Sequence, residues 1–220
     1  MIPTLNEEEA IAILILESRA SGFANVLVVD GFSSDRTREF SAQAGARVIQ
    51  QDFGRGKGCG VRTGMRIFLE EETDLLCIID GDGTNIPSYL PEMISAIHSQ
   101  GAEIVLGSRT RGRRDPKAMN TVSLASNLTV SFLLGAKFGR IFTDVQTGYW
   151  VFTRKAVETI YPRLRSTGFE IELEIFVTSL KEGIPVCEIP VGYRRRKGTT
   201  KFSFKLRLRS LYYAFKFLFL

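Results

Sequence analysis

Apolar runs of strand length alternate with segments of helical periodicity, and this alternation is the feature that most constrains the fold. The runs are residues 25–30, 46–49, 75–80, 103–107 and 189–193, and the helical patterns are residues 7–20, 34–44, 57–72 and 88–99. Strands that alternate with helices of this length are typical of βαβ units. We therefore expect an α/β fold with a mostly parallel, Rossmann-like sheet flanked by helices, and 220 residues suffice for one such domain.

Polar residues follow several of these runs at the point where each strand is expected to end. Asp30 follows the first run, Asp80 and Asp82 follow the third, and Arg109 follows the fourth, while Asn6 and Glu7 lie near the start of the chain. In open α/β sheets, ligands bind beyond the carboxyl ends of the strands. A lone Asp-Gly-Asp also fits a solvated turn, but acids after several strands favour a binding site on one rim of the sheet.

The pair Asp80 and Asp82, separated by one glycine, predicts a site for a hard divalent cation. Mg²⁺ or Mn²⁺ prefers oxygen ligands and is usually held by one or two carboxylates together with substrate phosphates. Such an ion would neutralise a departing nucleoside diphosphate. We therefore expect Asp80 and Asp82 to be the metal ligands.

The positive charge of the chain is concentrated at its end. Residues 189–220 hold nine Lys or Arg and no acid, whereas residues 1–188 have a net charge of −4. This segment predicts an anionic partner, either nucleic acid or a membrane surface. Its large apolar residues outnumber what a phosphate-tracking surface needs, so we expect a membrane and no nucleic acid. Residues 202–209 alternate as a strand would, but the spacing from residue 208 onward favours an amphipathic helix in the membrane interface.

The cysteines and the two ends of the chain indicate its setting. Three cysteines without paired spacing predict reduced thiols in a cytosolic compartment. The short apolar start suggests a truncated first strand, and the final Phe-Leu-Phe-Leu is too short to span a bilayer, which needs about 20 residues. We expect a protein at the cytoplasmic face of the cell membrane, peripheral or anchored by a segment beyond this chain.

Eight segments in order resemble the family-2 glycosyltransferases of the dolichyl-phosphate mannose synthase type. They are PTLNEEE (3–9), VLVVDGFSSDRT (26–37), GRGKGCGVRTGM (54–65), IIDGDGTNIP (78–87), GSR (107–109), DVQTGYWVF (144–152), GFEIELEIF (168–176) and YRRRKGTTKF (193–202). The resemblance runs over nearly the whole chain. It implies a GT-A domain over residues 1–201 and a membrane-interface segment over residues 202–220. It further implies inverting transfer of a hexose from a nucleotide-sugar donor to a dolichyl or polyprenyl phosphate acceptor, for glycan or cell-envelope assembly.

The resemblance also implies roles for individual residues. The expected catalytic residues are Asp82, Arg109 and Arg196, which would stabilise the leaving diphosphate. The residues expected to bind the nucleotide sugar are Pro3, Leu5, Glu7, Asp30, Lys57, Asp80, Gly81, Asp82, Arg109, Arg196 and Lys201. The acceptor would lie near Glu170 and Glu172.

Two departures from the family pattern affect the choice of substrate. The second acid expected after Asp30 is missing, and residues 120–128 lack an arginine that mannose-transferring relatives tend to carry for the acceptor phosphate. We therefore expect Arg113 and Arg114, or Lys117, to bind the acceptor phosphate, and we favour a UDP donor. UDP-glucose, UDP-N-acetylglucosamine and GDP-mannose all remain open as donors.

Two other enzyme classes share part of this pattern. A nucleotidyltransferase that makes a nucleotide sugar has the same kind of sheet, but it would need a glycine-rich phosphate loop near the N-terminus, where this chain is acidic. A glycosyltransferase with a non-lipid acceptor is the second alternative.

A lipid phosphate is already ionised at pH 7, so it can act as the nucleophile without a strong general base. Catalysis of sugar transfer to it depends on positioning and charge stabilisation.

Overall fold

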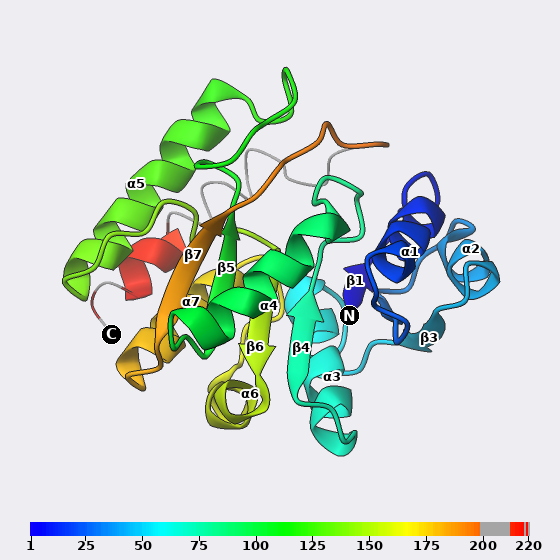
Figure 1. Cartoon of the computed structure of the whole chain (residues 1–220), viewed down its shortest axis with the longest axis horizontal. Coiled ribbons are helices and arrows are strands. Elements are labelled where there is room, and N and C mark those ends of the chain that lie inside the picture. The colour runs from blue at the N-terminus through cyan, green and yellow to red at the C-terminus, as the bar shows by residue number, and fades with distance from the viewer. Residues whose placement is uncertain (199–211, 218, 220) are drawn as a thin grey trace.

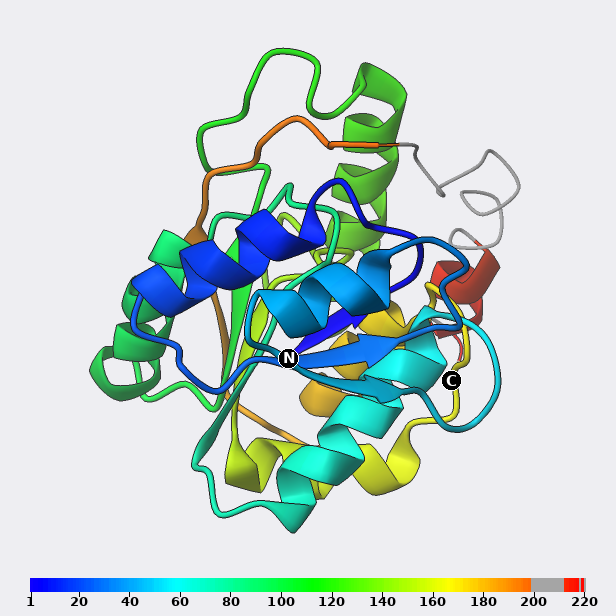
Figure 2. The same cartoon turned by 90° about the vertical axis from the view of Figure 1, so that its right-hand side faces the viewer.

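The computed structural model describes residues 1–198, 212–217 and 219. Its first sheet has three parallel strands in the order β1 (Ile2–Thr4), β2 (Leu27–Asp30) and β3 (Arg47–Gln50). Figure 2 shows these strands with α1 (Ile11–Ala20) and α2 (Thr37–Gln43) on one side and α3 (Lys57–Glu70) on the other. Each strand is therefore followed by a helix that crosses back over the sheet, as the sequence predicts.

The second sheet has four strands, and one of them runs against the others. Its order is β4 (Leu75–Ile78), β6 (Trp150–Thr153), β5 (Ile104–Ser108) and β7 (Val186–Pro190). β5 and β7 are parallel, while β6 is antiparallel to both β4 and β5. The chain start connects the two sheets, because the Met1 amine donates to the Cys77 carbonyl (2.7 Å) and the Ile79 amide donates to the Met1 carbonyl (3.2 Å).

Helices cover both faces of the second sheet. Figure 1 shows α4 (Leu90–Ser99) crossing in front of it and α7 (Ile171–Lys181) behind it, with α5 (Thr121–Lys137) at one edge. The remaining helical elements are α6 (Arg154–Ile160) and the short 3₁₀ turns η1 (Pro87–Tyr89) and η2 (Tyr161–Arg163). The described residues thus form helix, sheet and helix layers.

The strands place alternate side chains in two separate cores. Ile104, Leu106 and Phe152 pack with α3, α5, α6 and α7, whereas Val105 and Val151 pack with α1 and α4 on the other face. This is the period-two pattern of a strand buried on both faces. β4, β5 and β6 therefore consist largely of apolar residues, which is why the sequence reveals β4 and β5.

Strand β6 and the helices α5, α6 and α7 were not predicted from the sequence. The predicted strands correspond to β2, β3, β4 and β5, and the predicted helices correspond to α1, α2, α3 and α4. The strand predicted over residues 189–193 overlaps β7 only at Ile189 and Pro190, because β7 begins at Val186. Helix α5 begins with an N-cap, since the Asn120 side chain accepts a hydrogen bond from the Ser123 amide over 2.8 Å. That capping residue was the signal available in the sequence.

The expected membrane-interface segment lies mostly outside the described residues. Within it, residues 212–217 are helical and contact the domain: Ala214 is buried in the core, and the Lys137 amine donates to the Phe217 carbonyl over 2.9 Å. Figure 1 shows this short helix beside α5. Of the helices described here, none is both long enough and apolar enough to cross a bilayer.

Candidate active site

A cavity of about 550 Å³ opens at the rim where β1, β4 and β5 end. Its walls come from parts of the chain that are distant in sequence. The lining includes nine of the eleven residues predicted to bind the nucleotide sugar: Pro3, Leu5, Glu7, Lys57, Asp80, Gly81, Asp82, Arg109 and Arg196. The prediction that the strand ends share one rim is therefore correct, and the cavity has the size of a pocket for a small organic ligand.

Lys57 holds two carboxylates at the floor of this cavity. It begins α3, and its amine lies 2.6 Å from Asp80 Oδ1 and forms a second ion pair with Glu172 on α7. Burial, the largest single effect, lowers the pKa of Lys57, but the combined charges and hydrogen bonds of Asp80 and Glu172 raise it above its ordinary value. Burial raises the pKa of Glu172, and the charge of Asp80 adds to this, although Lys57 opposes both.

Arg196 connects the segment after β7 to two acids on the other side of the cavity. Its Nη1 donates to Asp82 Oδ2 over 2.6 Å, and its Nη2 donates to Glu7 Oε1 over 2.5 Å. The other oxygen of Asp82 accepts from the amide and hydroxyl of Thr84, which fixes the carboxylate in the turn after β4. Each member of the Asp80–Asp82 pair is thus in contact with a cation of the protein.

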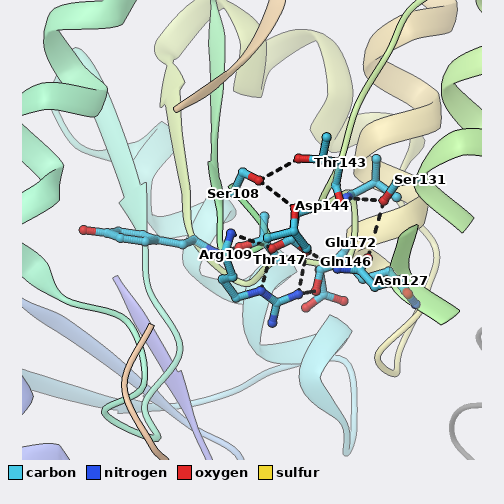
Figure 3. A network of polar contacts seen from close by, with 12 residues as sticks. Ser108, Arg109, Asn127, Ser131, Thr143, Asp144, Gln146, Thr147 and Glu172 are labelled. Carbon is cyan, nitrogen blue, oxygen red and sulfur yellow. Dashed lines mark hydrogen bonds and ion pairs between the residues drawn. The ribbon is translucent and has the colours of Figure 1, made fainter. Parts of the chain in front are cut away.

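Arg109 is held at the end of β5 by Asp144, as Figure 3 shows. Asp144 is fully buried and accepts from the Arg109 amide (2.8 Å), Nε (2.7 Å) and Nη2 (2.7 Å). Burial lowers the pKa of Arg109, but the charge and hydrogen bonds of Asp144, helped by Tyr193 and Asp80, raise it above its ordinary value. Arg109 is a permanent cation in this site.

Gly148 is required next to Asp80 because no side chain fits between them. A Cβ added at Gly148 would lie 2.0 Å from Asp80 Oδ2. Residue 148 precedes β6, and since β6 runs antiparallel, its beginning lies at the same rim as the ends of β4 and β5. The close approach sets the position of the Asp80 carboxylate.

The far side of the cavity is formed by the loop before α5 and the first turns of that helix. Lys117, Asn120, Ser123 and Asn127 line it there, together with Phe169 and Tyr193. Arg113 and Arg114 do not line the cavity. Their loop runs beside the segment after β7, where the Tyr193 amide donates to the Arg113 carbonyl over 2.9 Å. Of the three basic residues considered for an acceptor phosphate, the cavity therefore includes Lys117 alone.

Three other predicted residues lie off the cavity wall or outside the described residues. Asp30 is fully buried behind its neighbour Gly31, which does line the cavity; Asp30 Oδ2 accepts from the Ser33 amide. Glu170 is buried and accepts from the Gly168 amide, whereas Glu172 reaches the cavity. Lys201 lies outside the described residues.

The charges of the cavity suit an anionic ligand that arrives with a cation. Its lining has four acids, Glu7, Asp80, Asp82 and Glu172, and four bases, Lys57, Arg109, Lys117 and Arg196. In the described part of the chain, no group of three or more His, Cys, Asp or Glu side chains is arranged to hold a metal alone. Two carboxylates are nevertheless the set with which Mg²⁺ or Mn²⁺ is bound when substrate phosphates complete the coordination. The residues fit such an ion.

Sequence reasoning missed part of the lining. Gln51 at the end of β3, Asn120, Ser123 and Asn127 around the start of α5, and Gln146 before β6 were not predicted. Ser123 and Asn127 are four residues apart, and on a helix that spacing places them on one face. Recognising α5 from its cap would have identified both.

The fold is that of the GT-A glycosyltransferases. Glucosyl-3-phosphoglycerate synthase from Mycobacterium tuberculosis, solved with Mn²⁺, UDP and glucosyl-3-phosphoglycerate, has a similar structure, with a TM-score of 0.75 and 16% sequence identity. The superposition covers 100% of this chain and 78% of the synthase chain. The chain belongs to glycosyl transferase family 2, whose model matches residues 1–161.

Two curated relatives cover most of the chain. Glycosyltransferase AglJ of Haloferax volcanii is 37% identical over 196 residues, which is 89% of this chain and 62% of AglJ. Dolichyl-phosphate hexose transferase of the same organism is 31% identical over 201 residues, covering 90% of this chain and 83% of the relative. The chain thus spans less than two thirds of AglJ but most of the second relative.

Proposed function

We propose that this glycosyltransferase moves a hexose from a nucleotide sugar, with a preference for UDP, to the phosphate of a dolichol or other polyprenol. The observation that carries the proposal is the meeting of Asp80, Asp82, Lys57, Arg109 and Arg196 in one cavity at the strand ends. A similar hexose transferase is named for a dolichyl-phosphate substrate, and a protein of the same fold was solved with UDP.

The donor diphosphate is the ligand that this charge arrangement suits best. Arg109 and Arg196 present guanidinium groups to the cavity, and such groups bind phosphate oxygens through paired hydrogen bonds. Asp80 and Asp82 would hold a Mg²⁺ or Mn²⁺ ion, which supplies positive charge to the diphosphate when bound. Since the lining acids and bases are equal in number, the ion offsets the charge that the diphosphate brings into the cavity.

Transfer requires one displacement at the sugar. An oxygen of the acceptor phosphate forms a bond to the anomeric carbon, and the bond from that carbon to the donor diphosphate breaks. The nucleoside diphosphate leaves with the electron pair, and the configuration of the sugar inverts. No proton has to move, because the attacking phosphate is already ionised, so Arg109 and Arg196 act by holding the charge that develops on the leaving group.

The acceptor phosphate enters from the side of the cavity formed by Lys117, Asn120 and Ser123 in this proposal. These residues provide a cation and polar groups at the start of α5, opposite the Asp80–Asp82 pair. Glu172 also lines the cavity, where it is paired with Lys57. Arg113 and Arg114 would meet headgroups outside the cavity rather than the reacting phosphate.

A membrane surface on the α5 side would deliver such an acceptor. Phe132 on α5 is 67% exposed, Ile141 after it is 90% exposed, and Phe215 in the short helix beside it is 62% exposed. Large apolar side chains gathered on one side of a protein are typical of contact with lipid or another protein. We place the protein at the cytoplasmic face of the membrane, with residues 202–220 as an interfacial segment following a catalytic domain of residues 1–201.

The deciding experiment offers the enzyme a panel of donors with polyprenyl phosphate and Mn²⁺, read by mass spectrometry. UDP-glucose, UDP-N-acetylglucosamine and GDP-mannose are tested in turn, and we expect polyprenyl phosphate hexose together with an equal amount of UDP. Transfer to soluble phosphorylated acceptors but never to the lipid would overturn the choice of acceptor. Formation of a nucleotide sugar from a nucleoside triphosphate and a sugar phosphate would identify a nucleotidyltransferase instead.

A further inference from the structure

The carboxylate of Asp144 is used entirely inside the protein. It does not line the cavity, and four hydrogen bonds reach it: three from Arg109 and one from the Asn127 amide nitrogen, 2.5 Å from Oδ1. A group with no access to the cavity cannot touch a substrate there. Its effect on the reaction must pass through the residues that it contacts, and Arg109 is the one of these that carries charge.

The contacts of Asp144 select which edge of the Arg109 guanidinium is presented to the cavity. Nε and Nη2 are turned toward Asp144, and Nη2 also donates to the Gln146 carbonyl over 2.9 Å. Among the described residues, Nη1 has no hydrogen-bond partner, although only 13% of the Arg109 side chain is exposed. Arginine has several rotatable bonds, so a fixed side chain of this kind needs a partner that opposes its conformational entropy.

Asp144 is itself held from two directions. Its amide donates to Glu188 Oε1 on β7 over 2.8 Å, and the neighbouring Val145 amide donates to the Ser131 hydroxyl on α5 over 3.0 Å. Asn127 also comes from α5, the helix whose first turns line the opposite side of the cavity (Figure 3). The network therefore joins the strand end that presents Arg109 to the helix expected to meet the acceptor.

We propose that Asp144 is a positioning residue, which fixes Arg109 with its Nη1 edge toward the donor diphosphate, and that Asn127 secures Asp144 in this arrangement. The inference rests on the proposed function, since it assigns Arg109 a diphosphate to meet. A group preorganised in this way stabilises the leaving charge without rearranging during the reaction. Loss of a residue that orients a ligand-binding group typically costs about 10–100-fold in function.

Chemical rescue separates positioning from mere stability. Arg109→Ala should lower turnover at saturating donor by about a hundredfold. Millimolar guanidinium chloride, far below denaturing concentrations, should then restore turnover severalfold, because the Asp144 carboxylate and the Gln146 carbonyl remain to bind the added cation. Rescue should be lost in Arg109→Ala combined with Asp144→Asn. It should persist in Arg109→Ala combined with Glu103→Gln, which changes a half-buried acid that is paired with Lys155 away from the cavity.

The single variants give a second readout. Asp144→Asn should lower turnover about 10–100-fold. It should also weaken UDP binding, measured by calorimetry, by a factor of the same order as Arg109→Ala does. If Asp144→Asn does not fold, Asn127→Ala carries the test, and the rescue of Arg109→Ala should then weaken in the presence of Asn127→Ala.

Several results would overturn the positioning role while leaving the proposed function intact. Wild-type turnover in Asp144→Asn would do so, as would equal rescue with and without Asp144, or no rescue of Arg109→Ala. In each case the wild-type enzyme still transfers the sugar in the same assay. Absence of transfer by the wild-type enzyme would instead contradict the proposed function.

Discussion

Arg196 and Asp82 form an ion pair of 2.6 Å between residues that are 114 positions apart in the chain. The same guanidinium also reaches Glu7, so the segment after β7 is tied across the mouth of the cavity. In the proposed reaction, Asp82 would bind the metal ion and Arg196 would bind the diphosphate. The ion pair between the two residues must therefore break when the donor and its metal ion bind.

The first prediction concerns Arg196. We expect Arg196→Ala to lower turnover at saturating donor by about a hundredfold, because a charge-assisted donor to the leaving diphosphate is lost. Arg195→Ala is the matched control, since Arg195 is exposed and its recorded contact is made by its backbone amide. Unchanged turnover in Arg196→Ala with only weaker donor binding would contradict the role.

A second prediction concerns the metal. Excess chelator should abolish transfer, and added Mn²⁺ or Mg²⁺ should restore it. Asp82→Asn should reduce transfer to background while the protein keeps its melting temperature within a few degrees. Asp74→Asn removes an exposed carboxylate at the opposite end of β4 and should leave transfer unchanged. Full activity of Asp82→Asn, or of the wild type in chelator, is the contrary result.

A third prediction follows from the approach of Gly148 to Asp80. Gly148→Ala places a methyl group where Asp80 Oδ2 lies, so the carboxylate must move and transfer should fall as far as in Asp80→Ala. Gly183→Asn is the control, because Gly183 has a φ of +68° in open space, a conformation that Asn tolerates. Circular dichroism of both variants establishes that they fold, and a fully active Gly148→Ala would show that the Asp80 position is not critical.

Glu188 gives a prediction about pH. Burial raises its pKa, although hydrogen bonds from the Thr143 and Asp144 amides oppose the shift. Between the ordinary and the raised pKa, the folded state binds more protons than the unfolded state, so this contribution to the free energy of unfolding falls as pH rises.

The variant Glu188→Gln removes this titration. The stability of the wild type relative to Glu188→Gln should therefore decrease from about pH 4 to pH 7, measured by urea unfolding. Glu182→Gln, which alters an exposed acid paired with Arg163, should show no such slope difference. A wild-type advantage that grows with pH would reverse the sign assigned to Glu188.

The fifth prediction tests the membrane surface with point changes. Deleting the end of the chain is a poor test, because Ala214 is buried and Tyr213 and Phe217 pack against the core. We expect Phe132→Ser combined with Phe215→Ser to weaken flotation with anionic vesicles, and to reduce transfer to long polyprenyl phosphates more than to a short soluble analogue. Leu16→Ser, on the exposed face of α1, is the control. Unaltered flotation would show that these side chains do not contribute to membrane binding.

Much of the rim was predictable because a polar residue directly after a buried apolar run marks the end of a strand. Asp80, Asp82 and Arg109 each follow a buried apolar run, and the runs are long enough to be seen without a structure. The site residues next to β6, including Gly148, were harder to predict because they precede their strand rather than follow it. Lys117 could not be separated from Arg113 and Arg114 by sequence, since all three lie in one basic loop and only the path of that loop decides which reaches the cavity.

The contact between Glu7 and Arg196 also bears on how the protein is made. The two residues are 189 positions apart, so the cavity is assembled from one of the first parts of the chain to be synthesised and one of the later ones. Domains generally fold as units, and the chain emerges from its N-terminus during synthesis. Among the described strands, β5 pairs only with β6 and β7, which come after it in the chain, so the second sheet cannot form before those strands have been made. The donor site is complete only when the segment after β7, which carries Arg196, has left the ribosome. Acquisition of donor binding by a nascent chain therefore marks a late stage of its folding.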